Sequence, residues 1–245
     1  MTASSSGMAG WAFWLAVSGA VFVVVGPVLH RVGVLPLGPA LLAVPLGVVL
    51  SLVALWLSVI VLVGGRPTPP AGRGLVVGAV VASAVTGLLP VILVLPGLRA
   101  PAIHDITTDT STPPQFDAIV ALRADEPNSL EYGGSDIATM QHEGYPDLET
   151  LVVALPPAQV VEQARDVATA MGWEIVAADG PAGRLEASDT TFWFGFTDDI
   201  VLRARAVTGG TEVDVRSVSR VGVSDLGANA RRIRMFLERF AAASS

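Results

Sequence analysis

Three long runs of apolar residues without a single charge occupy the N-terminal part of the chain. They cover residues 11–29, 40–63 and 75–98. A helix needs about 20 apolar residues to cross the hydrocarbon core of a bilayer, so each run predicts a membrane-spanning helix. The leader of the first run, MTASSSGMAG, has no positive charge, and two further runs follow, which favours a permanent anchor over a cleaved secretory signal. The sequence therefore predicts a multi-pass protein embedded in a lipid bilayer.

The charged residues divide the chain into two parts that suit different solvents. All 22 acidic residues lie at or after Asp105, whereas residues 1–104 carry only arginines as charged side chains. No ionisable side chain lies inside a span, which argues against a transporter or proton pump, because a moving charge needs a partner within the membrane. The balance of Arg66 and Arg73 against Arg31 and Arg99, with the α-amino group added, slightly favours an inside N-terminus. We therefore expect an inner cell membrane location with the C-terminal domain outside the cytoplasm.

Composition also excludes several kinds of chemistry. The chain has no cysteine, which excludes disulfides, thiolate metal sites and thiol nucleophiles. Its net charge of −7 argues against nucleic acid as a partner, because phosphate contacts need a positive surface.

The C-terminal part reads as a soluble α+β domain. Residues 1–99 form the predicted anchor, residues 100–148 a loop-rich connector with short helices, and residues 149–241 the domain itself. TLVVAL (150–155) predicts a strand, and Pro156 with Pro157 suits the start of a helix. Four further strand signals follow, joined by short turns, before a last helix over 225–241 with Ser224 as its N-cap. The fold class is thus three transmembrane helices followed by a βαββββα antiparallel sheet with helices on one face.

The stretch VDVRSVSRVG (213–222) places arginines on one face of that sheet. A two-residue turn at Gly209 and Gly210, which pairs Thr208 with Thr211, would set Arg203 opposite Arg216 and Asp199 opposite Arg220. A strand over 184–196 and a loop at 197–199 would bring Trp193 beside Arg203. Opposed like charges are destabilising unless something binds between them, so this face predicts recognition of an anionic small molecule or lipid headgroup. The candidate residues are Trp193, Arg203, Arg205, Arg216 and Arg220. The alternative is a solvated face on which acids and arginines pair.

Four separated motifs resemble one known family. They are HDITTDTSTPPQF (104–116), GYPDL (144–148), FGFTDDIVLRAR (194–205) and VDVRSVSRVGVSDLGANARRI (213–233). Together they resemble the bacterial family called domain of unknown function 1499, over about residues 100–241. The resemblance implies no activity, substrate, cofactor or catalytic residue.

The same motifs also supply polar residues for a rival, enzymatic interpretation. His104, Asp105, Asp109 and His142 could serve a metal-assisted or general-acid/base hydrolase if they converged in one cleft. Asp and Thr in polar loops more often form turns and caps, and no HExxH, GxSxG or glycine-rich phosphate loop is present. We therefore expect no metal and no cofactor. A third interpretation makes the domain a docking module for another envelope protein.

Overall fold

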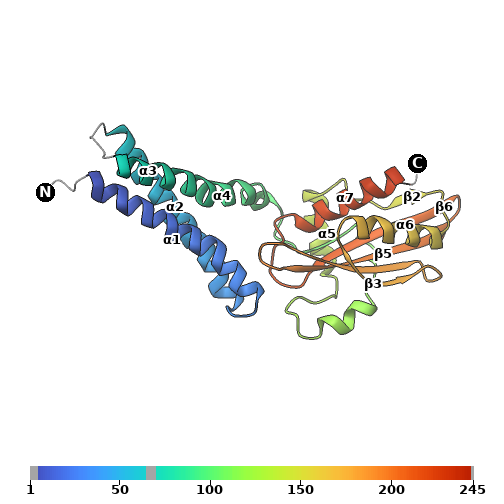
Figure 1. Ribbon diagram of the computed structural model, residues 1–245. Coiled ribbons are helices and arrows are strands. Elements are labelled where there is room, and N and C mark those ends of the chain that lie inside the picture. The colour runs from blue at the N-terminus through green and yellow to red at the C-terminus, as the bar shows by residue number, and fades with distance from the viewer. Residues whose placement is uncertain (1–4, 65–69, 244–245) are drawn as a thin grey trace. The chain divides into compact units, whose positions relative to one another are not determined.

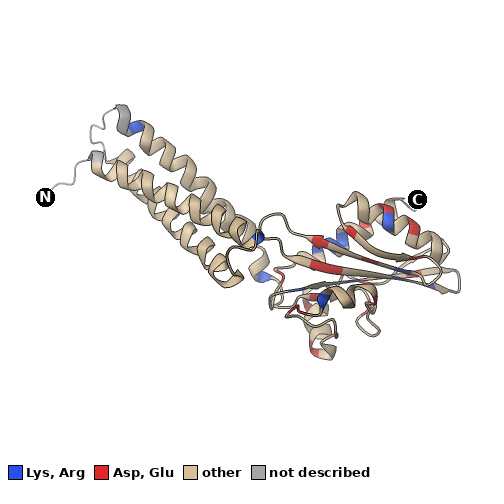
Figure 2. Ribbon diagram, turned by 60° about the horizontal axis from the view of Figure 1, so that its bottom comes forward, with Lys and Arg blue, Asp and Glu red and all other residues tan. Residues whose placement is uncertain are grey.

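The computed structural model describes residues 5–64 and 70–243 and divides the chain into two units, Met1–Pro96 and Gly97–Ser245. Within these described residues, three helices are long and apolar enough to cross a membrane: Gly7–Arg31, Leu37–Val63 and Arg73–Arg99. The three predicted spans are confirmed as apolar helices, which fits a membrane-anchored protein. Charged residues are gathered in the second unit (Figure 2). Arg66, on which the predicted orientation partly depends, lies outside the described residues.

The first unit contains α1 (Ser5–Arg31), α2 (Leu37–Val63), α3 (Pro70–Ser83), a π-helical turn η1 (Ala84–Leu88) and α4 (Leu89–Val94). Small residues let α1 and α2 approach closely, since a Cβ on Gly26 would overlap the Cβ of Ala43. The Ser51 and Thr86 hydroxyls form a 2.8 Å hydrogen bond between α2 and η1. The wide turn η1 lies just before Pro90, whose ring nitrogen cannot donate to the preceding turn.

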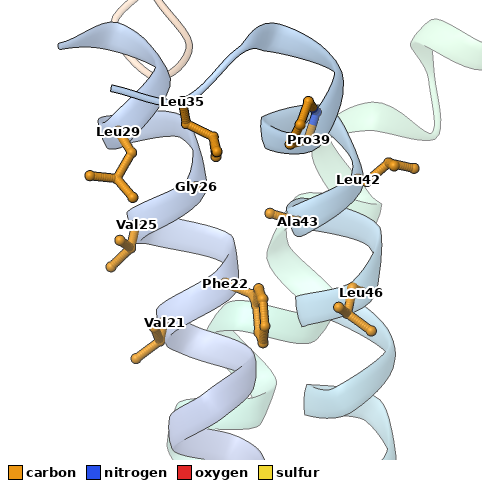
Figure 3. Close-up of a pocket in the computed structure, with 10 residues that line it drawn as sticks. All are labelled: Val21, Phe22, Val25, Gly26, Leu29, Leu35, Pro39, Leu42, Ala43 and Leu46. Atoms are coloured by element: carbon orange, nitrogen blue, oxygen red, sulfur yellow. The ribbon is translucent and has the colours of Figure 1, made fainter. Parts of the chain in front are cut away.

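An apolar groove of about 430 Å³ lies between α1 and α2 (Figure 3). Phe22, Gly26 and Leu29 line it from α1, and Leu42, Ala43 and Leu46 line it from α2. Because its lining is almost wholly hydrocarbon, the groove suits an acyl chain or apolar side chain and offers nothing to orient a polar ligand.

The second unit is an antiparallel sheet with strand order β1-β6-β5-β4-β3, and β2 also pairs with β6. In chain order its elements are η2 (Gly97–Arg99), β1 (Asp105–Thr107), η3 (Ala118–Arg123), α5 (Gly134–Gly144), β2 (Leu151–Val153), α6 (Pro157–Ala170), β3 (Glu174–Asp179), β4 (Arg184–Thr190), β5 (Thr197–Val207), β6 (Gly210–Ser219) and α7 (Ala228–Ala243). From β2 onward the order is the predicted βαββββα, and α6 and α7 lie together on one face of the sheet (Figure 1).

The hydrophobic core lies between the sheet and these two helices. Alternate positions of β5 and β6, such as Leu202, Val213 and Val215, are buried there. Helix α6 begins at Pro157, as predicted, and contributes Val160, Val161, Ala164, Val167 and Ala168. Helix α7 contributes Ile233, Phe236 and Phe240, and Phe236 stacks on Trp173 with ring centroids 5.2 Å apart. The apolar stripes of the two helices, which repeat about every 3.6 residues, thus pack against the sheet face on which every second strand residue is apolar.

The predicted turn of the β5–β6 hairpin lies one residue too late in the chain, so the predicted pairing of the two strands is wrong. Val207 pairs with Gly210, so the turn is Thr208 and Gly209, and Thr208 does not pair with Thr211. Gly209 adopts φ +93°, the left-handed region that favours glycine. Gly210 belongs to the strand because β2 approaches it closely, and a Cβ there would overlap the Val153 carbonyl oxygen. In the observed register Arg203 faces Asp214, Arg205 faces Glu212, and Arg216 faces Val201.

Two predicted boundaries also differ from the structure. Strand β4 ends at Thr190, and residues 191–196 form a loop closed by the Thr191 N–H donating to the Phe196 carbonyl at 2.8 Å. Strand β5 therefore begins at Thr197, which brings Asp198 and Asp199 into the sheet. The last helix begins at Ala228, and the side chain of Asp225, not Ser224, accepts the free N–H groups of Gly227 and Asn229.

Candidate functional site

Residues 105–133 of the connector cover the part of the sheet face opposite α6 and α7 that carries Glu186 and Arg216. Arg216 on β6 points into this layer and has no exposed surface. Its guanidinium donates to both carboxylate oxygens of Asp105, at 2.9 and 2.8 Å, and to the carbonyls of Pro114 and Leu130 at 3.1 and 2.8 Å. The predicted anion-binding arginine and a predicted acid/base residue are therefore each other's partner.

Two aromatic rings of the connector complete the environment of Arg216. Phe116 and Tyr132 lie 5.4 and 5.6 Å from the guanidinium carbon, in cation–π contact. Burial raises the pKa of Tyr132 to about 12, and the Asp105 carboxylate acts in the same direction. The Tyr132 hydroxyl is buried without a hydrogen-bond partner. This cluster is a desolvated, charge-balanced core on the second face of the sheet.

A second ion-pair group lies at the end of the same face. Asp199 on β5 is fully buried and accepts two 2.9 Å hydrogen bonds from Arg220 and one of 2.6 Å from Ser188. The guanidinium of Arg123, from η3, lies 3.4 Å from Asp199 and donates to the carbonyls of Asn128 and Ser219. Burial lowers the pKa of Arg123, and Asp199 opposes that shift. The predicted association of Asp199 with Arg220 is present, but as a contact beyond the strand end.

Arg203 forms a third group with Asp214 and Asp109. It donates to Asp214 at 2.7 Å, to Asp109 at 2.9 Å and to the carbonyl of Thr112 at 2.8 Å. Burial alone would raise the pKa of Asp109, but hydrogen bonds from Thr112, Arg203 and Ser111 outweigh it and lower that pKa below its usual value. Arg203 does face an arginine across the sheet, but that residue is Arg184 of β4, which pairs with Asp117 at 2.8 Å.

The five residues predicted to recognise an anion thus have different surroundings and different partners. Arg203, Arg205, Arg216 and Arg220 each pair with a carboxylate of the same domain, at the surface in the case of Arg205. Trp193 lies in the 191–196 loop beside Phe194. Phe116 and Tyr132 lie in contact with the Arg216 guanidinium, and Tyr145 lies in contact with that of Arg234. The opposed pair of Arg203 and Arg216, from which the site was inferred, is absent because the register differs.

The four candidate acid/base residues are held by separate partners. The His104 ring lies 3.4 Å from the Val223 carbonyl, and the His142 ring lies 3.0 Å from the Thr110 hydroxyl. Asp105 binds Arg216, and Asp109 accepts the N–H groups of Ser111 and Thr112 as the head of a turn. In the part of the chain that the structure describes, no three His, Asp or Glu side chains are grouped to hold a metal ion.

Sequence reasoning missed the buried polar residues that hold the layers together. Glu186 on β4 is fully buried and accepts the N–H groups of Asp117, Ala118 and Ile119 at the start of η3. On the helix face, buried Arg232 of α7 binds Asp189 and Asp198 at 2.8 and 2.6 Å. The sequence does place an acid or an arginine among apolar residues at these strand and helix positions. Charged residues are more often exposed to solvent than buried, so this pattern did not predict their burial.

One end of the sheet has a different surface from its faces. The 191–196 loop, the 221–226 loop and the entering segment 97–104 meet there, and we call these three segments the loop end. The Ile103 carbonyl accepts the Asp225 N–H, so the entering segment lies against the 221–226 loop. The Thr197 carbonyl accepts the Arg220 N–H, so the 191–196 and 221–226 loops adjoin neighbouring strands at the same end of the sheet. Phe192 is 92% exposed and Val223 is 81% exposed, the highest values for large apolar side chains among the described residues of this unit.

Comparison with known proteins places the second unit in a family. Among curated proteins, none matches the chain. Residues 105–240, more than half of the chain, match the family model described as "Protein of unknown function (DUF1499)". The match begins at Asp105 and ends within α7, so it contains the ion-pair layer, the sheet and both covering helices. The chain therefore belongs to the DUF1499 family, and it carries three apolar helices ahead of the family domain.

Proposed function

We propose that the protein is a membrane-anchored binding module whose contact surface is the loop end. The observation that carries this proposal is the coincidence of the two most exposed large apolar side chains of the domain, Phe192 and Val223, on two neighbouring loops. Exposed apolar side chains that gather in one place mark interaction sites more often than singly scattered ones do. The aromatic sequence TFWFGF (191–196) adds rigid contact area at low entropic cost.

The two sheet faces are poorly suited to the same role. Helices α6 and α7 cover one face with the hydrophobic core. The connector covers part of the other, where Arg203, Arg216 and Arg220 already hold carboxylates. An incoming anion would have to displace an internal acid and leave that acid buried without its partner, which is strongly unfavourable. The loop end, in place of the arginine face, is therefore the binding surface that we propose.

Site-specific photo-crosslinking in the native membrane tests the proposal. A photoreactive phenylalanine analogue is placed at Phe192 or Val223 of the full-length chain. We expect both positions to yield an adduct of the same mass, because the two loops contact one ligand or partner. Replacing Phe192 with serine should reduce the adduct formed from position 223, since the loops contribute to one surface.

Val152 provides the matched control position. It is an apolar side chain that is 58% exposed, and it lies on β2, which pairs with the start of β6 at the other end of the sheet. Equal adduct yields from positions 152, 192 and 223 would show that the loop end is no more a contact surface than other exposed apolar sites, and the proposal would then be wrong.

A further inference from the structure

The loop end has a chemical character that narrows what it binds, and we infer that its ligand is the headgroup region of the protein's own membrane. This inference rests on the proposed function and names the partner of that surface. The domain would then lie against the bilayer through loops 191–196 and 221–226, in addition to its attachment through the last span.

The loop end includes the segment by which the chain leaves that span. The third candidate span ends at Arg99, and β1 begins at Asp105. The residues between them extend over roughly 20 Å at most, at about 3.3–3.6 Å per residue. The entering segment is also held on the 221–226 loop, because the Ile103 carbonyl accepts the Asp225 N–H at 3.2 Å. The segment that joins the domain to the span is therefore itself part of the loop end.

A second contact ties the 221–226 loop to the last residues of the span sequence. Gly97 packs against Leu226 so closely that a Cβ on this glycine would lie 2.7 Å from the Leu226 Cβ. Leu226 adopts φ +53°, the left-handed region that a branched side chain rarely occupies, so the loop is held in a strained form there. Gly97 thus both belongs to the last apolar span and packs against the loop.

The side chains of the loop end match the chemistry of a membrane interface. Phe192 and Val223 can enter the boundary between headgroups and acyl chains, and Trp193 is the residue type enriched at that depth. Arg99 and Arg231 are exposed at the same end, and the Arg231 guanidinium donates to the Leu226 carbonyl at 3.0 Å. Apolar side chains flanked by cations favour a bilayer that contains anionic phospholipid.

Depth measurements on the full-length chain in vesicles test the inference. Because the chain has no cysteine, Phe192→Cys, Val223→Cys and the control Val152→Cys each give one labelling site for an environment-sensitive fluorophore. The labelled chains are reconstituted into vesicles of phosphatidylcholine, or of phosphatidylcholine with phosphatidylglycerol. Quenching is compared between a nitroxide attached to lipid near the headgroup and iodide in the water.

We expect the labels at 192 and 223 to be quenched several-fold more by the lipid nitroxide than the label at 152, and to be shielded from iodide. Quenching should increase in the anionic vesicles, and Arg99→Gln with Arg231→Gln should remove that increase. Labels at 192 and 223 that behave as the label at 152 does would overturn the inference. Equal quenching in both kinds of vesicle would overturn the part assigned to headgroup charge.

The result is separable from that of the crosslinking experiment. A protein adduct at 192 and 223 without lipid quenching would refute the membrane-docking inference and leave the loop end as a protein-binding surface. If the two positions give no adduct and no lipid quenching, both the proposed binding surface and the membrane-docking inference are refuted. Lipid adducts together with lipid quenching would support both, since one measurement reports the bonded molecule and the other reports depth.

Discussion

At the scale of single residues, Arg216 illustrates how this domain uses charge. Its guanidinium has no exposed surface and is satisfied by Asp105, two carbonyls and two aromatic rings. A charge can be buried only when its partners replace the hydration it loses. The family match begins at Asp105, so both members of this pair lie within the matched region.

Arg216→Met should destabilise the domain by about 3–5 kcal/mol, because it leaves the Asp105 carboxylate buried without a cation. Arg205→Gln is the matched control, since Arg205 is more than half exposed and pairs with Glu212 at the surface. Denaturant unfolding of the full chain in detergent, followed by near-ultraviolet circular dichroism, measures both. Equal effects of the two substitutions would contradict the structural role of Arg216.

Asp109 makes the stability of the folded domain depend on pH. The pKa of Asp109 is lower in the folded chain than in the unfolded chain, so it contributes stability above the unfolded value of about 3.9. That contribution is lost as the pH falls through this range toward the folded pKa. Asp109→Asn should therefore flatten the decline in stability between about pH 5 and pH 3. Parallel stability curves for the two proteins over that range would show that Asp109 makes no such contribution.

The sequence indicated which face of the sheet a residue occupies better than it indicated which partners that residue has there. The sequence indicated which positions of β5 and β6 turn away from the helices, including Asp199, Arg203, Asp214 and Arg216, and the structure confirms these faces. The sequence did not indicate that the arginine-bearing part of this face would be buried from solvent. Burial of Arg216 depends on chain segments more than 80 residues away, such as Leu130 and Asp105, and strand periodicity carries no information about them.

At the scale of elements, the β5–β6 hairpin shows how close packing sets a register. Two adjacent glycines allow more than one turn, and the apolar alternation is the same in the predicted and observed registers. The contact between Gly210 and the Val153 carbonyl of β2 distinguishes them. That contact is between segments far apart in the sequence, which is why local turn preferences placed the turn one position too late.

Gly210→Ala should displace β2 from β6 and destabilise the domain by about 1–3 kcal/mol, the usual cost of overpacking. Gly209→Asn is the control in the neighbouring position. Nothing lies within 4 Å of a Cβ on Gly209, and asparagine tolerates its positive φ better than other residues do. Unfolding midpoints of the two variants provide the comparison. A loss for Gly209→Asn as large as for Gly210→Ala would contradict the role assigned to the close approach.

Helix positions were easier to predict than the connector. The starts and apolar stripes of α6 and the three apolar helices follow from local patterns of Pro, Gly and hydrophobic residues. Residues 100–148 have few apolar residues at regular spacing, so they read as a loop-rich connector with short helices. In the structure they supply β1 and cover part of one sheet face through hydrogen bonds and ion pairs, which leave no periodic apolar signal.

At the scale of the whole molecule, the chain combines an uncharged helical unit with a domain whose ion pairs are mostly internal. Three apolar helices fit a membrane anchor. The sheet of the second unit is covered on one face by α6 and α7 and, around Glu186 and Arg216, on the other by the connector. Around Arg216 and Asp199 the arginine-bearing face is thus a closed structural layer, and we propose that contacts are made at the loop end.

Hydrogen–deuterium exchange of the full-length chain in lipid nanodiscs tests this claim most directly. We predict that β1 and the start of η3 exchange slowly together with β5 and β6 in the unmodified chain. Strand β1 pairs with β6, and the N–H groups at the start of η3 donate to the buried Glu186 carboxylate. In Arg216→Met, β1 and the start of η3 should exchange quickly while α6 and α7 keep their protection. Rapid exchange of β1 and the start of η3 in the unmodified chain would show that the arginine face opens to solvent, which would contradict the account.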